Sequence, residues 1–506
     1  MKQHTVTARH ATVASIAVVL CMAPAAHAAA TISSAATQNM SCTGGVCSPT
    51  AKNAVLNVGD LTTMLASGSV SVNTGTGSLA QQVQNIVVSA GFSWSSSSSL
   101  TLEAYDSVTV DKPVAVNGTG AVSLVTNNGG TSGNLSFGSK GSLSFLGTAN
   151  SLTIDGAAFT LENSVVALAA AINSNAAGNY ALAHSYDASK DGSYSGPPVT
   201  TTLSGAVQGL GNTISNLSIS GHPARVTNIG LFADIGQSGI VSNLVLTALS
   251  FNASSSHTGF NVGGLAGLNQ GTLEYDRTAG SVAVGANQAG GLVGDNQGTI
   301  VSSSSSVDVG TKSGWAGGVA GVNHGTILLS SASGSVRGII AGGLLAVDYG
   351  LHGVSQCFST GRVSGNTGAY LGGLVGESDG GEIENSYATG SVSGHQKSDI
   401  GGFLGLNAVE EVSSSYSTGH VSGPMGYSFV GGFVGTDDAD LTTNSYWDTT
   451  TSGTDDGVNG GNETGLTGLT TVQLQAGLPS GFDPTVWAQS PSINHGLPYL
   501  INNPSQ

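Results

Sequence analysis

Charged residues are scarce in this 506-residue chain. Only 8% of the residues are Asp, Glu, Lys or Arg, and 12 basic residues stand against 29 acidic ones, so the formal net charge is −17. Nucleic acids and anionic membrane surfaces are bound through basic patches, for which this composition supplies few residues. The composition therefore argues against nucleic acid and anionic lipid as partners.

Long apolar runs are also lacking, with one exception at the N-terminus. There a basic segment precedes an apolar stretch over residues 11–26, and Ala-His-Ala follows at 26–28. This is the pattern of a cleaved signal peptide over 1–28; a membrane anchor is the alternative, but the run is short and contains Pro24. We therefore expect a secreted or cell-surface protein that has no membrane span in its mature chain.

Cysteine is nearly absent as well. The chain after the predicted signal contains Cys42 and Cys47, in the stretch CTGGVC, and Cys357. In an exported protein the close pair predicts a disulfide loop, since a zinc site would need a second pair of ligands. We interpret Cys357 as a small, buried and inert residue, with a reactive thiol as the alternative.

Glycine is abundant, with 77 residues, and short apolar alternations lie between Gly, Asn and Ser from Ala54 onward. Examples are VLNV, IVVS, LTL, VTV and VAV, each a minimal strand of period two. No Gly-X-Y period runs through the chain, which excludes collagen. The stretch 162–174 is dense in Ala and Leu and predicts a helix, and the polar stretch 175–202 predicts an insertion.

The second half of the chain is a repeat array, in which a Gly pair recurs every 25 to 30 residues, at 263, 290, 317, 342, 372, 401 and 431. Three apolar positions return with it. The first comprises Leu265, Leu292, Val319, Leu344, Leu374, Phe403 and Phe433. The second comprises Leu273, Ile300, Ile327, Val354, Ile383, Val412 and Leu441. The third comprises Val282, Val309, Val336, Val363, Val392 and Val421.

One repeat thus supplies three short strands whose apolar side chains point to a common axis. Stacking the repeats about 4.8 Å apart gives three parallel sheets around a continuous core. The sequence therefore predicts an all-β parallel β-helix (solenoid) with a short helical insertion. After Thr451 the composition changes to a Gly- and acid-rich loop and then to a segment with Phe482, Trp487 and Tyr499. We expect this segment to cap the open end of the array.

Two polar or aromatic columns accompany the repeat. One turn position predicts a ladder of stacked, hydrogen-bonded side chains: Asn269, Asn296, Asn323, Asp348, Ser378, Asn407 and Asp437. Another position predicts a stack of rings: Phe358, Tyr387, Tyr416 and Tyr446. Cys357 then aligns with Ser386 and Ser415.

The stretches GGLVGDNQGTI from Gly290 and GGLVGESDGGEIENSYATGSVSG from Gly372 resemble the GLUG-motif repeat. The first half, with FSWSSSSSLTLEAYDSVTVDKPVAVNG from Phe92, resembles filamentous-haemagglutinin-like adhesins. The resemblance implies a right-handed β-helix, secretion by a Gram-negative bacterium and an outer-membrane export partner. The expected segments are a signal peptide (1–28), a flexible lead-in with the Cys42/Cys47 loop (29–50), a haemagglutinin-like β-helix (51–161), a helix with a polar insertion (162–202), a GLUG-repeat β-helix (203–450) and a C-terminal loop and cap (451–506).

Few residues are candidates for chemistry. The stretch GESDG at Gly376 matches the G-x-S-x-G nucleophile motif, but its Ser378 falls in the predicted ladder. No H-E-x-x-H occurs. Acidic residues gather in successive turns, and a weak Ca²⁺ site is one hypothesis for Glu377, Asp379, Asp437 and Asp438. A glycosidase or lyase pair that also involves Glu410, and a solvated acidic edge, are the alternatives.

We expect no resident cofactor and a function in binding, since every candidate for a nucleophile or base is explained by the packing of the repeat. The predicted function is adhesion to a host or bacterial surface glycan or protein by a non-catalytic adhesin-like β-helix. The alternative is a carbohydrate-active β-helix enzyme, a polysaccharide lyase or hydrolase, that uses the acidic turns.

Overall fold

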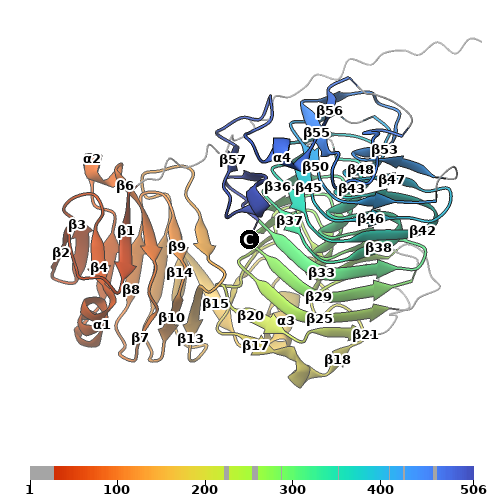
Figure 1. Ribbon diagram of the computed structural model, residues 1–506. Coiled ribbons are helices and arrows are strands. Elements are labelled where there is room, and N and C mark those ends of the chain that lie inside the picture. The colour runs from red at the N-terminus through yellow and green to blue at the C-terminus, as the bar shows by residue number, and fades with distance from the viewer. Residues whose placement is uncertain are drawn as a thin grey trace, which may run out of the picture.

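The computed structural model describes residues 28–220, 227–253, 260–285, 288–350, 353–409, 411–424, 428–459 and 464–505. In this part of the chain, short parallel strands stack coil upon coil into two β-solenoids whose stacks run in different directions (Figure 1). The prediction of an all-β parallel β-helix is confirmed. Of the predicted signal peptide, only Ala28 lies within the described residues.

The first solenoid has three parallel sheets. Sheet A contains β1 (Ala28–Ser33), β4 (Val55–Asn57), β6 (Val83–Val88), β9 (Val108–Val110) and β12 (Leu135–Phe137). Sheet B contains β2 (Met40–Thr43), β3 (Val46–Pro49), β5 (Val70–Asn73), β8 (Leu100–Glu103), β11 (Val122–Val125) and β14 (Leu152–Ile154). Sheet C contains β7 (Phe92–Trp94), β10 (Pro113–Val116) and β13 (Ser142–Phe145). Alternate residues of each strand point into one core.

The N-terminal lead-in differs from the prediction of a flexible segment. Residues 28–33 form β1, which pairs with two strands, and β2 and β3 form an antiparallel hairpin in which Cys42 and Cys47 are joined by a disulfide. The hairpin is ordered because Cys47 is fully buried in the core of the first solenoid. Residues 29–50 are mostly polar, so their short apolar alternation did not predict these strands.

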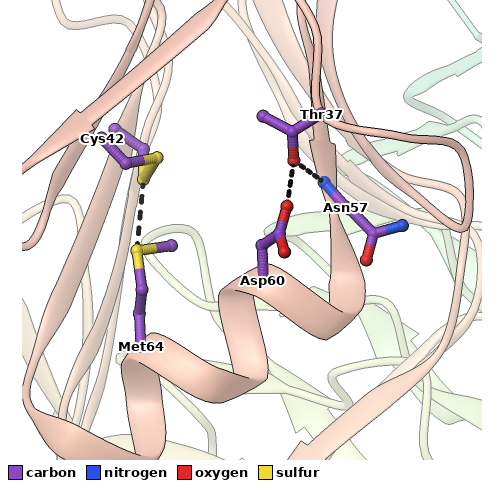
Figure 2. The surroundings of a disulfide bond; sticks show 6 residues. Thr37, Cys42, Asn57, Asp60 and Met64 are labelled. Carbon is purple, nitrogen blue, oxygen red and sulfur yellow. Dashed lines mark hydrogen bonds between the residues drawn. A yellow bond between two sulfur atoms is a disulfide. The ribbon is translucent and has the colours of Figure 1, made fainter.

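A helix that was not predicted, α1 (Val58–Ser67), packs beside this hairpin (Figure 2). Asn57 caps it by accepting a hydrogen bond from the Gly59 amide at 2.7 Å, and Leu61 and Leu65 are buried one turn apart. The Thr37 hydroxyl accepts from the Asn57 amide at 3.0 Å and donates to Asp60 at 2.5 Å. These contacts fix the helix across the start of the solenoid. A short helix α2 (Gly77–Ala80) follows β5.

The two solenoids are joined by β15 (Ala157–Glu162). This strand is antiparallel to β14 and parallel to β16 (Asn179–Leu182), the first strand of the second solenoid. The predicted helix is confirmed as α3 (Val165–Ser174), capped by the Ser164 hydroxyl, and it buries Val165, Leu168 and Ile172 beneath the second core. The insertion contains β17 (Tyr186–Asp187), the 3₁₀ turn η1 (Ala188–Asp191) and β18 (Ser193–Tyr194).

The second solenoid also has three sheets, here named D, E and F. Sheet D contains β16, β19 (Ala206–Gln208), β24 (Ile240–Ser242), β28 (Thr272–Glu274), β32 (Thr299–Val301), β36 (Thr326–Leu328), β40 (Val354–Ser355), β44 (Glu382–Glu384), β49 (Glu411–Ser413) and β54 (Thr442–Thr443). Sheet F contains β23 (Phe232–Ile235), β27 (Ala266–Asn269), β31 (Val293–Asn296), β35 (Ala320–Asn323), β39 (Leu345–Asp348), β43 (Val375–Ser378), β48 (Leu404–Asn407) and β53 (Val434–Asp437).

Sheet E is the widest of the three and curves around one side of each coil. Its long part contains β20 (Thr213–Ser215), β21 (Ser218–Ser220), β25 (Val245–Ala253), β29 (Arg277–Val284), β33 (Ser304–Thr311), β37 (Ser331–Ala332), β38 (Val336–Gly342), β41 (Phe358–Ser359), β42 (Val363–Gly372), β45 (Tyr387–Ala388), β46 (Val392–Ser393), β50 (Tyr416–Ser417), β51 (Val421–Ser422), β55 (Ser445–Asp448) and β56 (Leu466–Leu469). Its short strands are β22 (Asn228–Ile229), β26 (Asn261–Gly263), β30 (Gln288–Gly290), β34 (Trp315–Gly317), β47 (Asp399–Gly401) and β52 (Phe429–Gly431).

The predicted register of the repeat holds with one exception. Every residue of the first and third apolar positions is at most 3% exposed, and so is the second position from Leu273 to Val412. The prediction for Leu441 is wrong: its exposed fraction is 49%, and Thr442 pairs with Val412 inside the stack. Backbone register fixes which side chain points inward, and here it places the polar Thr442 in the core and the apolar Leu441 outside.

The Gly pairs mark a place where two backbones touch. In each coil the chain reverses at the pair, so that a short strand of sheet E lies face to face with a strand of sheet F. A Cβ added at Gly372 would lie 1.8 Å from the carbonyl oxygen of Val375, and one at Gly376 would lie 2.8 Å from that of Ala346. Side chains larger than hydrogen do not fit at the first position, which explains why the Gly pair recurs.

The segment predicted as a loop and cap (451–506) has two parts. Residues 456–458 and β56 form a last partial coil at the end of the array, through backbone bonds from Gly432, Phe433 and Val434 and the pairing of β55 with β56. The chain then runs back along one flank through α4 (Thr471–Leu474), β57 (Trp487–Gln489), the turn η2 (Asn494–Gly496) and β58 (Pro498–Leu500).

This segment covers the ring stack of sheet E because the rings point outward and need an apolar cover. Phe358, Tyr387 and Tyr416 stack at centroid distances of 4.9 and 5.1 Å, as predicted. Trp487 and Phe482 lie against them, and the hydroxyls of Tyr416 and Tyr446 donate to backbone carbonyls of the C-terminal segment at 2.7 Å.

Candidate functional site

The predicted Asn ladder lies inside the second solenoid, at the end of the strands of sheet F. Its members are paired coil to coil in the predicted register from Asn269 to Asp437. The side-chain amides donate along the axis, from Asn269 to Asn296 and from Asn296 to Asn323 at 2.8 Å, and from Asn407 to Asp437 at 3.2 Å. Asn269, Asn296, Asn323 and Asn407 are fully buried. The ladder satisfies backbone turns and presents nothing to a ligand.

Cys357 belongs to a second ladder, of which the sequence predicted only the alignment of Cys357 with Ser386 and Ser415. Its amide donates to the hydroxyl of Ser386 at 3.1 Å, and its sulfur accepts from the amide of Ser330 at 3.4 Å. Ser303 and Ser415 make the same contacts in their own coils. Burial raises the pKa of the Cys357 thiol to about 12, which makes the thiolate a minor species at neutral pH.

Ser378, the serine of GESDG, is fully buried in the Asn ladder between Asp348 and Asn407. It ends a strand of sheet F, and its hydroxyl has no hydrogen-bond partner among the described residues. A nucleophile must reach a substrate from a strand-to-helix turn. Ser378 instead ends a strand and lies inside the stacked side chains of the Asn ladder.

The four residues of the Ca²⁺ hypothesis lie on two coils that are not adjacent, Glu377 and Asp379 at the end of β43 and Asp437 and Asp438 at the end of β53. Glu377 is half-buried next to the exposed Asp379, and Asp437 accepts from the amides of Ala439 and Asp440 at 2.9 and 3.1 Å. Asp438 is exposed. Within the described ranges no three His, Cys, Asp or Glu side chains gather closely enough to hold a metal ion. The hypothesis therefore has no assembled set of ligands in this part of the chain; Glu410 lies outside it.

The structure brings together a set of residues that the sequence reasoning missed, on the outer surface beside the Asn ladder. Two columns form most of it, and Asp295 and Glu377, which share one register position of sheet F, lie beside them. The first column is one register position of sheet E, two residues before the glycine that ends β34, β38, β42, β47 and β52: Trp315, Ile340, Tyr370, Asp399 and Phe429. The residue after each ladder position gives His324, Tyr349 and Asp379, whose amides bond to the preceding coils. Aligning the repeats by these two positions, and not only by their apolar ones, would have shown both columns.

We name this surface the ring–carboxylate face and define it by the rings of Trp315, His324, Tyr349, Tyr370 and Phe429 and the carboxylates of Asp295, Glu377, Asp379 and Asp399. The rings of His324 and Tyr349 stack at 5.3 Å. Nδ1 of His324 lies 3.1 Å from Oδ1 of Asp295. The exposed fraction of Phe429 is 52%, and Trp315, Tyr349 and Tyr370 are half-buried. The strands that carry the face include β42, β43 and β47, labelled in Figure 1.

Among the described residues, no Lys or Arg side chain lies within 4.0 Å of the carboxylates of this face. Burial and the charge of Asp379 raise the pKa of Glu377, and burial and the charge of Asp438 raise the pKa of Asp399. Burial and the charges of Glu377 and Asp379 likewise raise the pKa of Tyr349. Throughout the described ranges, His324–Asp295 is the one contact within 4.0 Å between a basic and an acidic side chain. The face thus carries negative charge that the protein itself leaves unbalanced.

A hollow of about 470 Å³ lies elsewhere, between α3 and residues 194–200. Val166, Asn173, Tyr194 and Pro198 line it, and Oδ1 of Asn173 accepts from the amides of Thr200 and Thr201. None of the predicted site residues lies there. The lining has no charged side chain, which makes the hollow part of the packing between helix and insertion.

Residues 367–393 match the family model of the GLUG motif. The matched stretch runs through the end of β42, β43, β44, β45 and β46, which is one coil of the second solenoid. No curated protein matches the chain. The match and the recurring Gly pairs support a GLUG repeat protein built as a parallel β-solenoid. None of the helices in the described part combines the length and apolar character that crossing a bilayer requires.

Proposed function

We propose that the chain is a secreted or cell-surface adhesin-like protein, exported through a cleaved signal peptide over residues 1–28, that binds surfaces, glycans or other cells without catalysis. A GLUG-repeat solenoid gives a stiff body whose coils repeat the same outward positions every 25 to 30 residues. Such repetition suits many weak contacts along one ligand or surface, because linked contacts add in free energy.

The observation that carries this proposal is the outward column of sheet E. Trp315, Tyr370 and Phe429 lie in one register on alternate coils, on the surface and outside the core. Exposed rings in a regular row are a recurrent feature of interfaces, since each ring offers an apolar face and a wet edge.

A carbohydrate-active enzyme is the second candidate. Glu382 and Glu411 are directly paired on adjacent coils, and burial together with the charges of Glu384 and Glu411 raises the pKa of Glu382. A pair of carboxyl groups is the equipment of a glycosidase. The exposure of both side chains on an open sheet favours the binding function.

A paired experiment tests both functions. Purified chain from residue 29 to 506 is applied to glycan and matrix-protein arrays, and the same preparation is incubated with neutral and acidic polysaccharides. Binding without new reducing ends or unsaturated uronates is the expected result. Release of product that disappears on Glu382→Gln would overturn the adhesin proposal and establish the enzyme.

A further inference from the structure

We propose that the ring–carboxylate face binds a polysaccharide that carries free amino groups. This deepens the proposed function and rests on it, because it names the surface and the chemical class of the ligand. The spacing of the rings, the unbalanced charge between them and the pairing of the backbone beneath them each support this ligand.

The rings repeat along the axis at a distance that suits a chain of sugars. Trp315, Tyr370 and Phe429 occupy the same position two coils apart each time. Coils are about 4.8 Å apart, so the rings recur about every 10 Å, which is of the order of a disaccharide. The C–H face of a pyranose stacks on an exposed aromatic ring. Alternate sugars of one extended chain would meet successive rings.

The positions between the rings carry acidic groups. Asp399 stands between Tyr370 and Phe429 in the same column, and Glu377 lies close enough to Tyr370 and Tyr349 to raise the pKa of both. Carboxylates held close together repel one another, and a ligand cation that enters the row removes this repulsion. An ammonium group beside an aromatic ring is also attracted by the ring itself. An amino sugar supplies both the flat face and the cation.

The same charges select against other glycans. Chains of uronates or sulfated sugars would add negative charge to a row that already lacks counter-charge, and like charges placed together cost affinity. A neutral glycan could stack on the rings but would leave the carboxylates partly desolvated and unpaired. The face therefore complements an aminated chain best.

A basic peptide would supply the positive charge, but it would lack the backbone edge or groove through which extended peptides bind a sheet. On this face most backbone groups are used within the stack: His324, Tyr349 and Asp379 donate their amides to the coil before, and the strands of sheet E from β34 to β47 pair on both sides. From β34 to β47 the strands offer no free edge, so the side chains make the contact there, which suits a ring-shaped ligand.

The test uses the full mature chain and three probes: a hexamer of β-1,4-linked glucosamine, its fully N-acetylated counterpart, and hexalysine. Titration calorimetry should show binding of the glucosamine hexamer at least tenfold tighter than of either other probe. Tyr370→Ala should weaken that binding about tenfold through loss of one stacking ring, and the double change Glu377→Gln with Asp399→Asn should do the same through loss of charge.

The matched control is the double change Asp308→Asn with Asp483→Asn. It removes the same charge from two exposed side chains, one on β33 and one in the C-terminal segment, both outside the defined face. We expect it to bind the glucosamine hexamer within twofold of the wild type. Melting curves of all variants identify any that fail to fold, and Tyr370→Leu, which also removes the ring, replaces Tyr370→Ala if that variant does.

The outcomes separate the two proposals. Equal binding of hexalysine and the glucosamine hexamer, with no effect of Tyr370→Ala, would show an acidic surface only and overturn the inference. Equal binding of the N-acetylated hexamer would overturn the role of charge. Array binding that the face variants leave unchanged would overturn the inference and leave adhesion standing, whereas a wild-type chain that binds nothing would remove both.

Discussion

Two buried carboxyl groups stand where other coils carry neutral side chains. Asp348 occupies the Asn ladder, and its Oδ1 accepts from Asn323 and from the Gly350 amide at 2.9 Å. Asp276 occupies the second ladder, that of Ser303 and Cys357, and its Oδ1 accepts from the Leu244 amide at 2.9 Å. In both, Oδ2 is buried without a partner among the described residues. A protonated carboxyl resembles an Asn amide in shape and combines a donor with an acceptor oxygen, so each fits its ladder as the neutral acid.

The first prediction concerns Asp348. Burial raises its pKa from 3.8 to about 7. The folded state therefore holds a proton that the unfolded state releases near pH 4, so the stabilisation is complete below that pH and is lost as pH rises towards 7. Asp348→Asn keeps the ladder contacts without the titration. The variant should exceed the wild type by about 1–3 kcal/mol at pH 8 and show a flatter pH profile of unfolding.

Urea denaturation at pH 5 and pH 8 measures this difference. Asp276 titrates in both proteins, since burial raises its pKa well above the usual range, so the comparison isolates Asp348. The exposed Asp379→Asn serves as control and should keep the wild-type slope. A variant less stable than the wild type at pH 8 would mean that Asp348 is needed as a charged group.

The second prediction tests the contact of backbones at the Gly pair. Gly372→Ala places a Cβ 1.8 Å from the Val375 carbonyl oxygen, which only movement of the backbone can relieve. We expect a loss of about 1–3 kcal/mol or more in the free energy of unfolding. Gly310→Ala is the matched control, because an added Cβ there meets no atom within 4 Å. Equal stability of the two variants would contradict the proposed packing.

At the scale of elements, the C-terminal segment acts as a strap along the flank. Leu474, Phe482, Trp487, Leu497 and Leu500 form one apolar cluster with the ring stack of sheet E. The indole of Trp487 donates to Oδ1 of Asn385 at 3.0 Å, and Asn503 donates to the carbonyl oxygens of Ser330 and Gln356. The strap thus ties together coils that are more than a hundred residues from it in sequence.

The third prediction is that Trp487→Ala loosens this strap. The change removes the largest fully buried side chain of the cluster and should cost about 3–5 kcal/mol. Limited proteolysis should then release a fragment from the region after residue 465 while the coils stay resistant. Val472→Ala, at a side chain that is 75% exposed, is the control and should leave the cleavage rate unchanged.

The elements also show what the sequence could and could not predict. The Gly period, the three apolar positions, the helix at 162–174 and the order of both columns were predictable, because each coil meets the same packing demand and the pattern repeats. Helix α1 was missed since Asn57 caps a single occurrence of Leu61 and Leu65 with no repeat to support it. The prediction for Leu441 failed because a hydrophobic residue was expected to point inward, whereas the strand register places Thr442 there.

The candidate surface was beyond the sequence for a different reason. Trp315, Tyr349, Tyr370 and Asp399 come from different coils and vary in type, so composition shows no motif. Only the register of sheets E and F brings them onto one face. The acidic turns were visible in the sequence, yet their distribution over the coils depends on the register of the strands.

At the scale of the whole molecule, the two solenoids are joined by more than their linker. The last strands of the first solenoid would end in unpaired backbone groups, and the second solenoid satisfies them. The amides of Leu143 and Phe145 donate to the carbonyl oxygens of Leu210 and Ala183 at 2.9 and 2.7 Å, and Asn212 donates to that of Leu143. The open edge of one solenoid is thus closed by the flank of the other, which removes a site of unwanted strand pairing.

The last prediction tests this closure at Asn243. Its side chain accepts from the Phe137 amide at 3.2 Å and donates to the Leu135 carbonyl oxygen at 3.1 Å, so it replaces a neighbouring strand for β12. Asn243→Ala leaves both groups buried and unpaired, which should cost about 1–3 kcal/mol. Hydrogen exchange at the Phe137 amide should accelerate, while the amides of β6, deeper in sheet A, exchange as in the wild type. The exposed Arg337→Ala is the control. If the Phe137 amide stays equally protected in Asn243→Ala, the joint is held by the backbone bonds to Leu210 and Ala183 and not by the side-chain amide.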